Sequence, residues 1–114
     1  SSGAIAAMRF AEKNKIFGSV LVGAYYTDMG EEMEKKSGYF NRPWDWQAIK
    51  NNQHWIIQFA SADDPFIPIE EARAVHRFLG TEYHEYSDQK HFGGGEASKT
   101  EFSDLILALT FKIF

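Results

Sequence analysis

The chain alternates between short apolar runs and segments in which apolar residues recur every three or four positions. Residues 17–24 and 55–61 are almost continuously apolar, which is typical of strands covered on both faces in a parallel sheet. Residues 82–86 alternate between charged and aromatic side chains, as a half-buried edge strand does. These three runs predict three strands.

Helical patterns fill the gaps between the strands and follow the last one. Helix-forming composition or helical spacing of apolar residues marks residues 3–13, 31–36, 47–51, 69–79 and 98–113. The fourth of these segments opens after Pro68 and stops at Gly80, a common helix terminator. The last one starts with Ser-Lys-Thr-Glu, the pattern of a capping box.

Strands that alternate with helices predict an α/β fold, with about three parallel strands and helices flanking the sheet. The 114 residues suffice for one domain. A three-stranded parallel sheet with two open edges is a poor stand-alone domain. We therefore expect residues 1–114 to be the C-terminal portion of one larger domain, whose N-terminal strands are missing here.

Composition narrows the class of protein. The chain is 44% hydrophobic and 25% charged, as soluble globular proteins are, and we expect a cytoplasmic location. A net charge of −4 without a basic cluster argues against a nucleic-acid partner. The absence of cysteine excludes disulfides and thiolate metal sites. The apolar runs are far shorter than the ~20 residues of a membrane span, so no membrane association is expected.

Three candidate residues occur in the order Ser…Asp…His, which is the chain order of the α/β-hydrolase triad. Ser1 precedes the first helix, Asp64 follows the second strand, and His91 follows the third. The exits of parallel strands share one edge of the sheet. A histidine there could activate a serine, and an aspartate could fix the histidine's tautomer. Taken singly, Asp63 and Asp64 could equally cap a helix, and His91 could be an ordinary loop residue.

A segment dense in aromatic and turn residues, 37–46, connects the first two strands and must cross one face of the sheet. Its large aromatic side chains are Tyr39, Phe40, Trp44 and Trp46. They could line a substrate pocket for an apolar acyl or leaving group, or they could simply pack. The sequence leaves both alternatives open, although packing is the more common role. His76, inside the fourth helix, is interpreted as structural or exposed.

Six short stretches, spread over nearly the whole chain, carry a family resemblance. They read Ser-Ser-Gly-Ala-Ile-Ala-Ala-Met-Arg at 1–9, Ser-Gly-Tyr-Phe at 37–40, Arg-Pro-Trp at 42–44, Gln-Phe at 58–59, Asp-Asp-Pro-Phe at 63–66 and His-Phe at 91–92. Together they resemble the C-terminal portion of the retinoblastoma-binding protein 9 family of small serine hydrolases. The resemblance implies an α/β-hydrolase-type three-layer sandwich, present here in part.

The resemblance also implies roles for individual residues. The family's nucleophile falls on Ser1, its acid is Asp64 rather than Asp63, and its base is His91. The backbone N–H of Ser2 would be one oxyanion-hole donor. The implied activity is cleavage of a small ester or amide through an acyl-enzyme, with neither a cofactor nor a metal ion.

The chain departs from the family pattern at three places that bear on activity. The Gly-His that precedes the family's nucleophile is absent, and so is the early loop that would supply a second oxyanion donor. Lys90 stands where the family has glycine before its base. We expect the 114-residue piece alone to be inactive and marginally stable, and the complete protein to be a hydrolase.

Three other hypotheses compete with this one. The chain could be an inactive hydrolase fragment that binds a protein partner; however, the family's Leu-x-Cys-x-Glu motif needs a cysteine, and none is present. Ser1 could act as an N-terminal nucleophile with its own amine as base. A metal site could use Asp63, Asp64, Asp88 and His91, but no ligand-spacing motif supports it.

Overall fold

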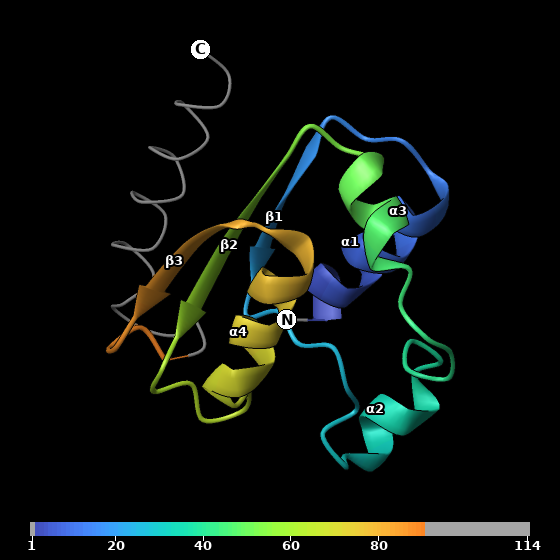
Figure 1. Cartoon of the computed structure of the whole chain (residues 1–114). Helices are drawn as coiled ribbons and strands as arrows, with labels where there is room; N and C mark the ends of the chain where they lie inside the picture. Colours follow the sequence, from blue (N-terminus) through green and yellow to red (C-terminus); the bar gives the residue numbers. More distant parts are fainter. Residues whose placement is uncertain (1, 91–114) are drawn as a thin grey trace.

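The computed structural model describes residues 2–90, which form an open three-stranded sheet with helices packed on it (Figure 1). In chain order the elements are α1 (Ser2–Lys13), β1 (Gly18–Val22), α2 (Glu32–Lys36), α3 (Trp46–Asn51), β2 (Trp55–Ser61), α4 (Ile69–Leu79) and β3 (Glu82–Tyr86). The strand order is β1-β2-β3, and both pairs are parallel. The predicted parallel sheet with flanking helices is therefore confirmed.

The predicted bounds of β2 and β3 agree with the structure, whereas β1 is shorter than predicted. The prediction placed this strand at residues 17–24, but it ends at Val22. Gly23 has a φ of 63°, in the left-handed region, and this turns the chain out of the extended conformation. The predicted helix over residues 98–113 lies outside the described residues.

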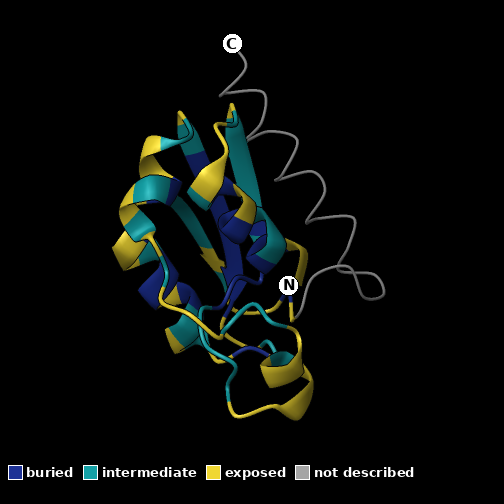
Figure 2. Cartoon of the chain, turned by 90° about the vertical axis from the view of Figure 1, so that its right-hand side faces the viewer, coloured by how far each residue is buried: buried dark blue, intermediate teal, exposed yellow. Residues whose placement is uncertain are grey.

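One face of the sheet carries most of the core. α1 packs against β1, α4 packs against β2, and α3 lies against both helices. The most deeply buried apolar side chains of this layer are Ile5, Met8, Leu21, Ile49 and Val75. Burial of each such side chain stabilises the fold by ~1.5–3 kcal/mol. Figure 2 shows the buried residues gathered between the sheet and these helices.

The opposite face of the sheet carries a second apolar cluster, because successive side chains of a strand point to opposite faces. Ile57 and Phe59 of β2 form its centre, and both are buried. Val20 and Val22 of β1 and Tyr86 of β3 pack around them. The sheet therefore has apolar residues on both faces, as the sequence of β2 predicts.

A chain of hydrogen-bonded polar side chains crosses the helix-covered layer. Gln58 of β2 is fully buried and donates to the Ala72 carbonyl at 2.8 Å. The Thr81 hydroxyl donates to Gln58 Oε1 at 2.8 Å, and His76 Nδ1 lies 3.0 Å from the same hydroxyl. His76 is therefore a structural residue, which fits the requirement that buried polar groups be hydrogen-bonded.

The carboxyl ends of all three strands lie at one edge of the sheet because the strands are parallel. The first turn of α1 lies near the same edge (Figure 1). This arrangement brings the start of α1 and the exits of β2 and β3 into one region. Among the helices of residues 2–90, none has the length and apolar character that crossing a membrane requires.

Candidate active site

The loops that leave β2 and β3 are joined by hydrogen bonds at this edge. The hydroxyl of Ser61, the last residue of β2, donates to Asp63 Oδ1 at 2.6 Å and accepts from the Gln89 backbone N–H at 3.0 Å. Asp63 Oδ1 also accepts from the Lys90 backbone N–H at 2.7 Å. We call these four residues the exit network. It fixes the β3 exit loop, up to residue 90, against the exit of β2.

The two neighbouring aspartates make different contacts. The hydrogen bond from the Ser61 hydroxyl, and after it the one from the Lys90 N–H, lowers the pKa of Asp63 below that of an ordinary aspartate. Asp64 Oδ1 instead accepts from the backbone N–H groups of Phe66 and Ile67, at 2.8 and 3.0 Å. These two bonds orient the half-buried Asp64 carboxylate within its own turn.

Of the four residues assigned to the reaction, two lie within the described residues. Ser2 is the exposed first residue of α1. The first N–H groups of a helix have no acceptor within the helix, so the Ser2 N–H is not consumed by the α1 backbone. Asp64 lies at the exit of β2. Ser1 and His91 lie outside the described residues, and the roles of all four residues stay predictions.

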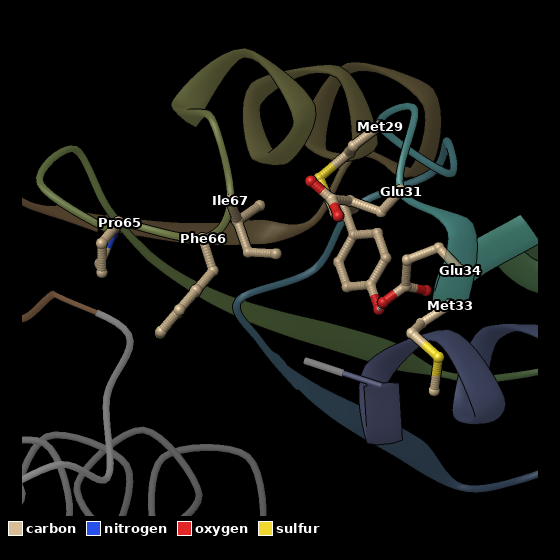
Figure 3. A pocket seen from close by; sticks show the side chains of 8 residues that line it. Met29, Glu31, Met33, Glu34, Pro65, Phe66 and Ile67 are labelled. Carbon is tan, nitrogen blue, oxygen red and sulfur yellow. Dashed lines mark hydrogen bonds between the residues drawn. The ribbon is translucent and has the colours of Figure 1, made fainter.

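A pocket of about 400 Å³ opens beside residues 65–67, which directly follow Asp64 in the sequence (Figure 3). It is lined from the exit of β1, from α2 and the residue before it, and from the exit of β2, by Tyr25, Met29, Glu31, Met33, Glu34, Pro65, Phe66 and Ile67. Its position beside the strand exits is where open α/β sheets bind ligands. The size falls within the range of small-molecule sites, ~300–1,000 Å³.

Hydrogen bonds hold the walls of this pocket in place. The buried Tyr25 hydroxyl donates to Glu34 Oε1 at 2.9 Å. Burial, and then the bond to Glu34, raises the pKa of Tyr25 well above its ordinary value, so the phenol keeps its proton. Glu71 Oε1 accepts from the Thr27 N–H at 3.0 Å and from the Thr27 hydroxyl at 2.7 Å, which ties the exit of β1 to α4.

No sequence pattern predicted this pocket. The charged run at residues 31–36 indicated a helix, and Met33 and Glu34 from that run line the cavity. One signal was available. Met33 is an isolated large apolar residue among charged ones, and it is 81% exposed. An exposed apolar side chain next to a cavity is more informative than the charges around it.

Comparison with known proteins identifies the family. No model of a known protein family matches the chain. The chain is 48% identical over 106 residues to the serine hydrolase RBBP9 of Rattus norvegicus, a match that covers 93% of this chain and 54% of that protein. The chain belongs to the retinoblastoma-binding protein 9 family. It spans about half the length of this relative, so the activity of a whole family member is not established for it.

A solved structure supports the same fold. The crystal structure of the ydeN gene product from B. subtilis matches with a TM-score of 0.70 at 20% sequence identity. The match covers 80% of this chain and 50% of that one. With its parallel sheet and flanking helices, the chain is part of an α/β-hydrolase-type fold.

Two sequence pieces that carry the retinoblastoma-binding protein 9 resemblance meet at Arg9. Its guanidinium donates to the carbonyls of Tyr39, at 2.7 and 2.9 Å, and of Arg42, at 2.8 Å. It also donates to the Pro43 carbonyl at 3.0 Å and lies over the Trp44 ring, 3.6 Å from its centroid. Arg9 is thus a structural cation that shapes the connection over residues 39–44.

The four aromatic residues for which the sequence left packing and substrate binding open pack against the core. Trp44 stacks on Trp46, with ring centroids 5.3 Å apart, and Trp46 stacks on Phe78 of α4 at 4.8 Å. None of the four lines the pocket of the described residues. Phe40 does stack on the pocket residue Tyr25, with ring centroids 5.6 Å apart. A direct role of these aromatics in substrate binding stays a prediction.

Lys90, which departs from the family pattern, has a backbone conformation that favours glycine. Its φ is 51°, in the left-handed region. A side chain there costs ~1–2 kcal/mol, and glycine avoids this cost. The family's glycine at this place therefore has a conformational explanation.

The metal hypothesis gains no support from the part of the chain that the structure describes. Within residues 2–90, no three carboxylate or imidazole side chains gather closely enough to hold a metal ion. Asp63 and Asp64 instead bond to backbone N–H groups of their own or the neighbouring loop.

Proposed function

We propose that this chain belongs to a serine hydrolase that cleaves a small ester or amide through an acyl-enzyme. Ser1 is the nucleophile, His91 the general base and Asp64 the acid that orients the histidine. The observation that carries the proposal is the exit network. It holds the backbone of residues 89 and 90 against the exit of β2, next to the turn that carries Asp64 and one residue before His91 in the sequence.

The chemistry follows from these roles. The Ser1 hydroxyl attacks the substrate carbonyl carbon while His91 removes its proton. The tetrahedral oxyanion accepts a hydrogen bond from the Ser2 N–H. His91 then donates the proton to the leaving group, and the acyl-enzyme forms. A water molecule, deprotonated by His91, hydrolyses this ester and restores Ser1. Asp64 stabilises the imidazolium at each stage.

The pocket supports a small substrate with an apolar part. Met29, Phe66 and Ile67 contribute apolar surface, and the cavity opens directly beside the turn that carries Asp64. We propose that the acyl or leaving group of the ester lies there.

The test is covalent labelling with a fluorophosphonate probe, using protein expressed from its complete coding sequence. Wild type should be labelled at Ser1, and Ser1→Ala should abolish labelling. Asp64→Asn should lower the labelling rate by ~10⁴-fold, because the histidine loses its tautomer and orientation. Ser37→Ala, which removes an exposed hydroxyl far along the chain, should label as wild type does.

Absence of labelling in wild type, or labelling that survives Ser1→Ala, would reject the hydrolase proposal. Either result would favour the alternative of an inactive hydrolase fold that binds a protein partner.

A further inference from the structure

The exit network continues the contact between the β2 and β3 chains beyond the end of their backbone pairing. The parallel pairing of β2 and β3 ends at Ser61 and Tyr86, and one backbone bond, from Ala62 N–H to the Tyr86 carbonyl at 2.7 Å, continues it. Beyond that point the chains are joined through the side chains of Ser61 and Asp63. These two side chains therefore decide where the β3 exit loop goes.

The network fixes two consecutive backbone groups. The Gln89 N–H points at the Ser61 hydroxyl and the Lys90 N–H points at Asp63 Oδ1. Ser61 is 2% exposed and Gln89 is 8% exposed, so the first of these bonds is shielded from water. Two adjacent N–H groups held by two acceptors fix the position and orientation of the backbone at residues 89 and 90.

The backbone at Lys90 needs such support. A side chain at its φ of 51° is unfavourable by ~1–2 kcal/mol, and conformations of this kind persist where surrounding contacts impose them. The bond to Asp63 is the contact at this residue's own N–H. The Asp63 carboxylate therefore stabilises the left-handed backbone conformation of Lys90.

We propose that Ser61 and Asp63 are positioning residues, which set the backbone geometry from which the proposed base His91 departs. This inference rests on the proposed function and adds to it a role for two residues outside the triad. Asp63 acts as a hydrogen-bond acceptor for the Ser61 hydroxyl and the Lys90 N–H, and its charge is dispensable for that purpose. Asp64, one residue later, would need its charge to stabilise the imidazolium.

This distinction gives a sharp test, because an amide oxygen accepts hydrogen bonds as a carboxylate does. Asp63→Asn keeps an acceptor for both the Ser61 hydroxyl and the Lys90 N–H, whereas Asp63→Ala removes it. For p-nitrophenyl butyrate hydrolysis, Asp63→Ala should lower kcat by ~10- to 100-fold with little change in KM, since a base displaced by ~1 Å loses about this much. Asp63→Asn should recover kcat to within about threefold of wild type.

Asp88→Ala is the matched control. Asp88 is an exposed carboxylate of the same loop, and its contact is to the Gln89 side chain at 3.3 Å rather than to the β2 exit. Its removal should leave kcat and KM at the wild-type values. Thermal unfolding of each variant confirms that the rates are measured on folded protein.

Amide hydrogen exchange supplies a readout that does not need catalysis. Exchange at the Lys90 amide should be faster in Asp63→Ala and near the wild-type rate in Asp63→Asn. Wild-type kcat in Asp63→Ala, or unchanged exchange at Lys90, would overturn the inference. An equal loss of kcat in Asp63→Asn and Asp63→Ala would overturn it as well, because charge would then be what matters. A wild-type protein that the fluorophosphonate does not label would reject the proposed function itself.

Discussion

Arg9 and Asp63 each hold the backbone of a distant loop, but they do so in opposite surroundings. Arg9 is 6% exposed and donates to three carbonyls of the connection over residues 39–44. Asp63 lies on the exposed edge of the sheet and accepts from a hydroxyl and one backbone N–H. A buried charge that loses its partners is costly, whereas exposed groups can turn to water. We infer that Arg9 contributes mainly to stability and Asp63 mainly to geometry.

The largest effect should follow from removing the buried cation. Arg9→Met keeps much of the side-chain volume but leaves the carbonyls of the 39–44 connection without the guanidinium as donor. It also removes the cation 2.8 Å from the buried Glu12 carboxylate, which keeps its hydrogen bond from the Asp45 N–H. We expect the free energy of unfolding to fall by ~3–5 kcal/mol. Chemical denaturation monitored by circular dichroism measures this loss.

Arg73→Met is the matched control for Arg9→Met. Arg73 pairs with Glu85 at 2.9 Å on the surface, and exposed ion pairs contribute only ~0–1 kcal/mol. If Arg9→Met and Arg73→Met lowered the free energy of unfolding by similar amounts, burial would not explain the contribution of Arg9. The contrast between the buried Arg9 and the exposed Asp63 would then be wrong.

The same contrast explains which features the sequence could predict. The bounds of β2 and β3 followed from local patterns, an apolar run and an alternation, because a strand's side chains repeat every two residues. The partners of Arg9 lie 30 to 34 positions further along the chain. No local pattern contains that information, so the arginine passed unnoticed.

At the exposed edge, the sequence indicated which residue types matter but not which contacts they make. The family resemblance singled out Asp64 and left Asp63 with no assigned role. The bond from the Lys90 N–H to Asp63 depends on β3 lying directly beside β2. In the aromatic segment, the sequence could not indicate the role of the residues, because Trp44 and Trp46 look the same in the sequence whether they bind a ligand or pack.

Substitutions of intermediate effect should distinguish residues that pack in the core from residues that bind the substrate. Trp46→Leu removes the stacking on Trp44 and Phe78, and we expect unfolding to become easier by ~1–3 kcal/mol with KM unchanged. Met33→Ala trims an exposed wall of the pocket. It should raise KM for p-nitrophenyl butyrate by ~3- to 10-fold and change stability by no more than ~0.5 kcal/mol.

Steady-state kinetics and thermal unfolding of both variants decide between packing and binding. A larger rise in KM for Trp46→Leu than for Met33→Ala would support the alternative that the aromatic segment lines the substrate site. The substrate would then bind at the aromatic segment rather than at the edge of the sheet.

The smallest effect concerns the backbone strain at the exposed edge. Lys90→Gly relieves a left-handed φ of 51°, worth ~1–2 kcal/mol. The greater freedom of glycine in the unfolded chain offsets ~0.5–1 kcal/mol of that gain. We expect a net stabilisation of about 0.5–1 kcal/mol, measured by denaturant unfolding.

Gly80 provides the reverse substitution for comparison. It ends α4 with a φ of 63°, and a Cβ built there has no atom within 4 Å, so Gly80→Lys adds strain without a clash. It should destabilise by roughly the amount that Lys90→Gly gains. If Lys90→Gly gave no gain while Gly80→Lys lost stability, the contacts at Lys90 would already offset the strain. The hydrogen bond to Asp63 would then contribute to stability as well as to geometry, and the division of roles between Arg9 and Asp63 would be less sharp.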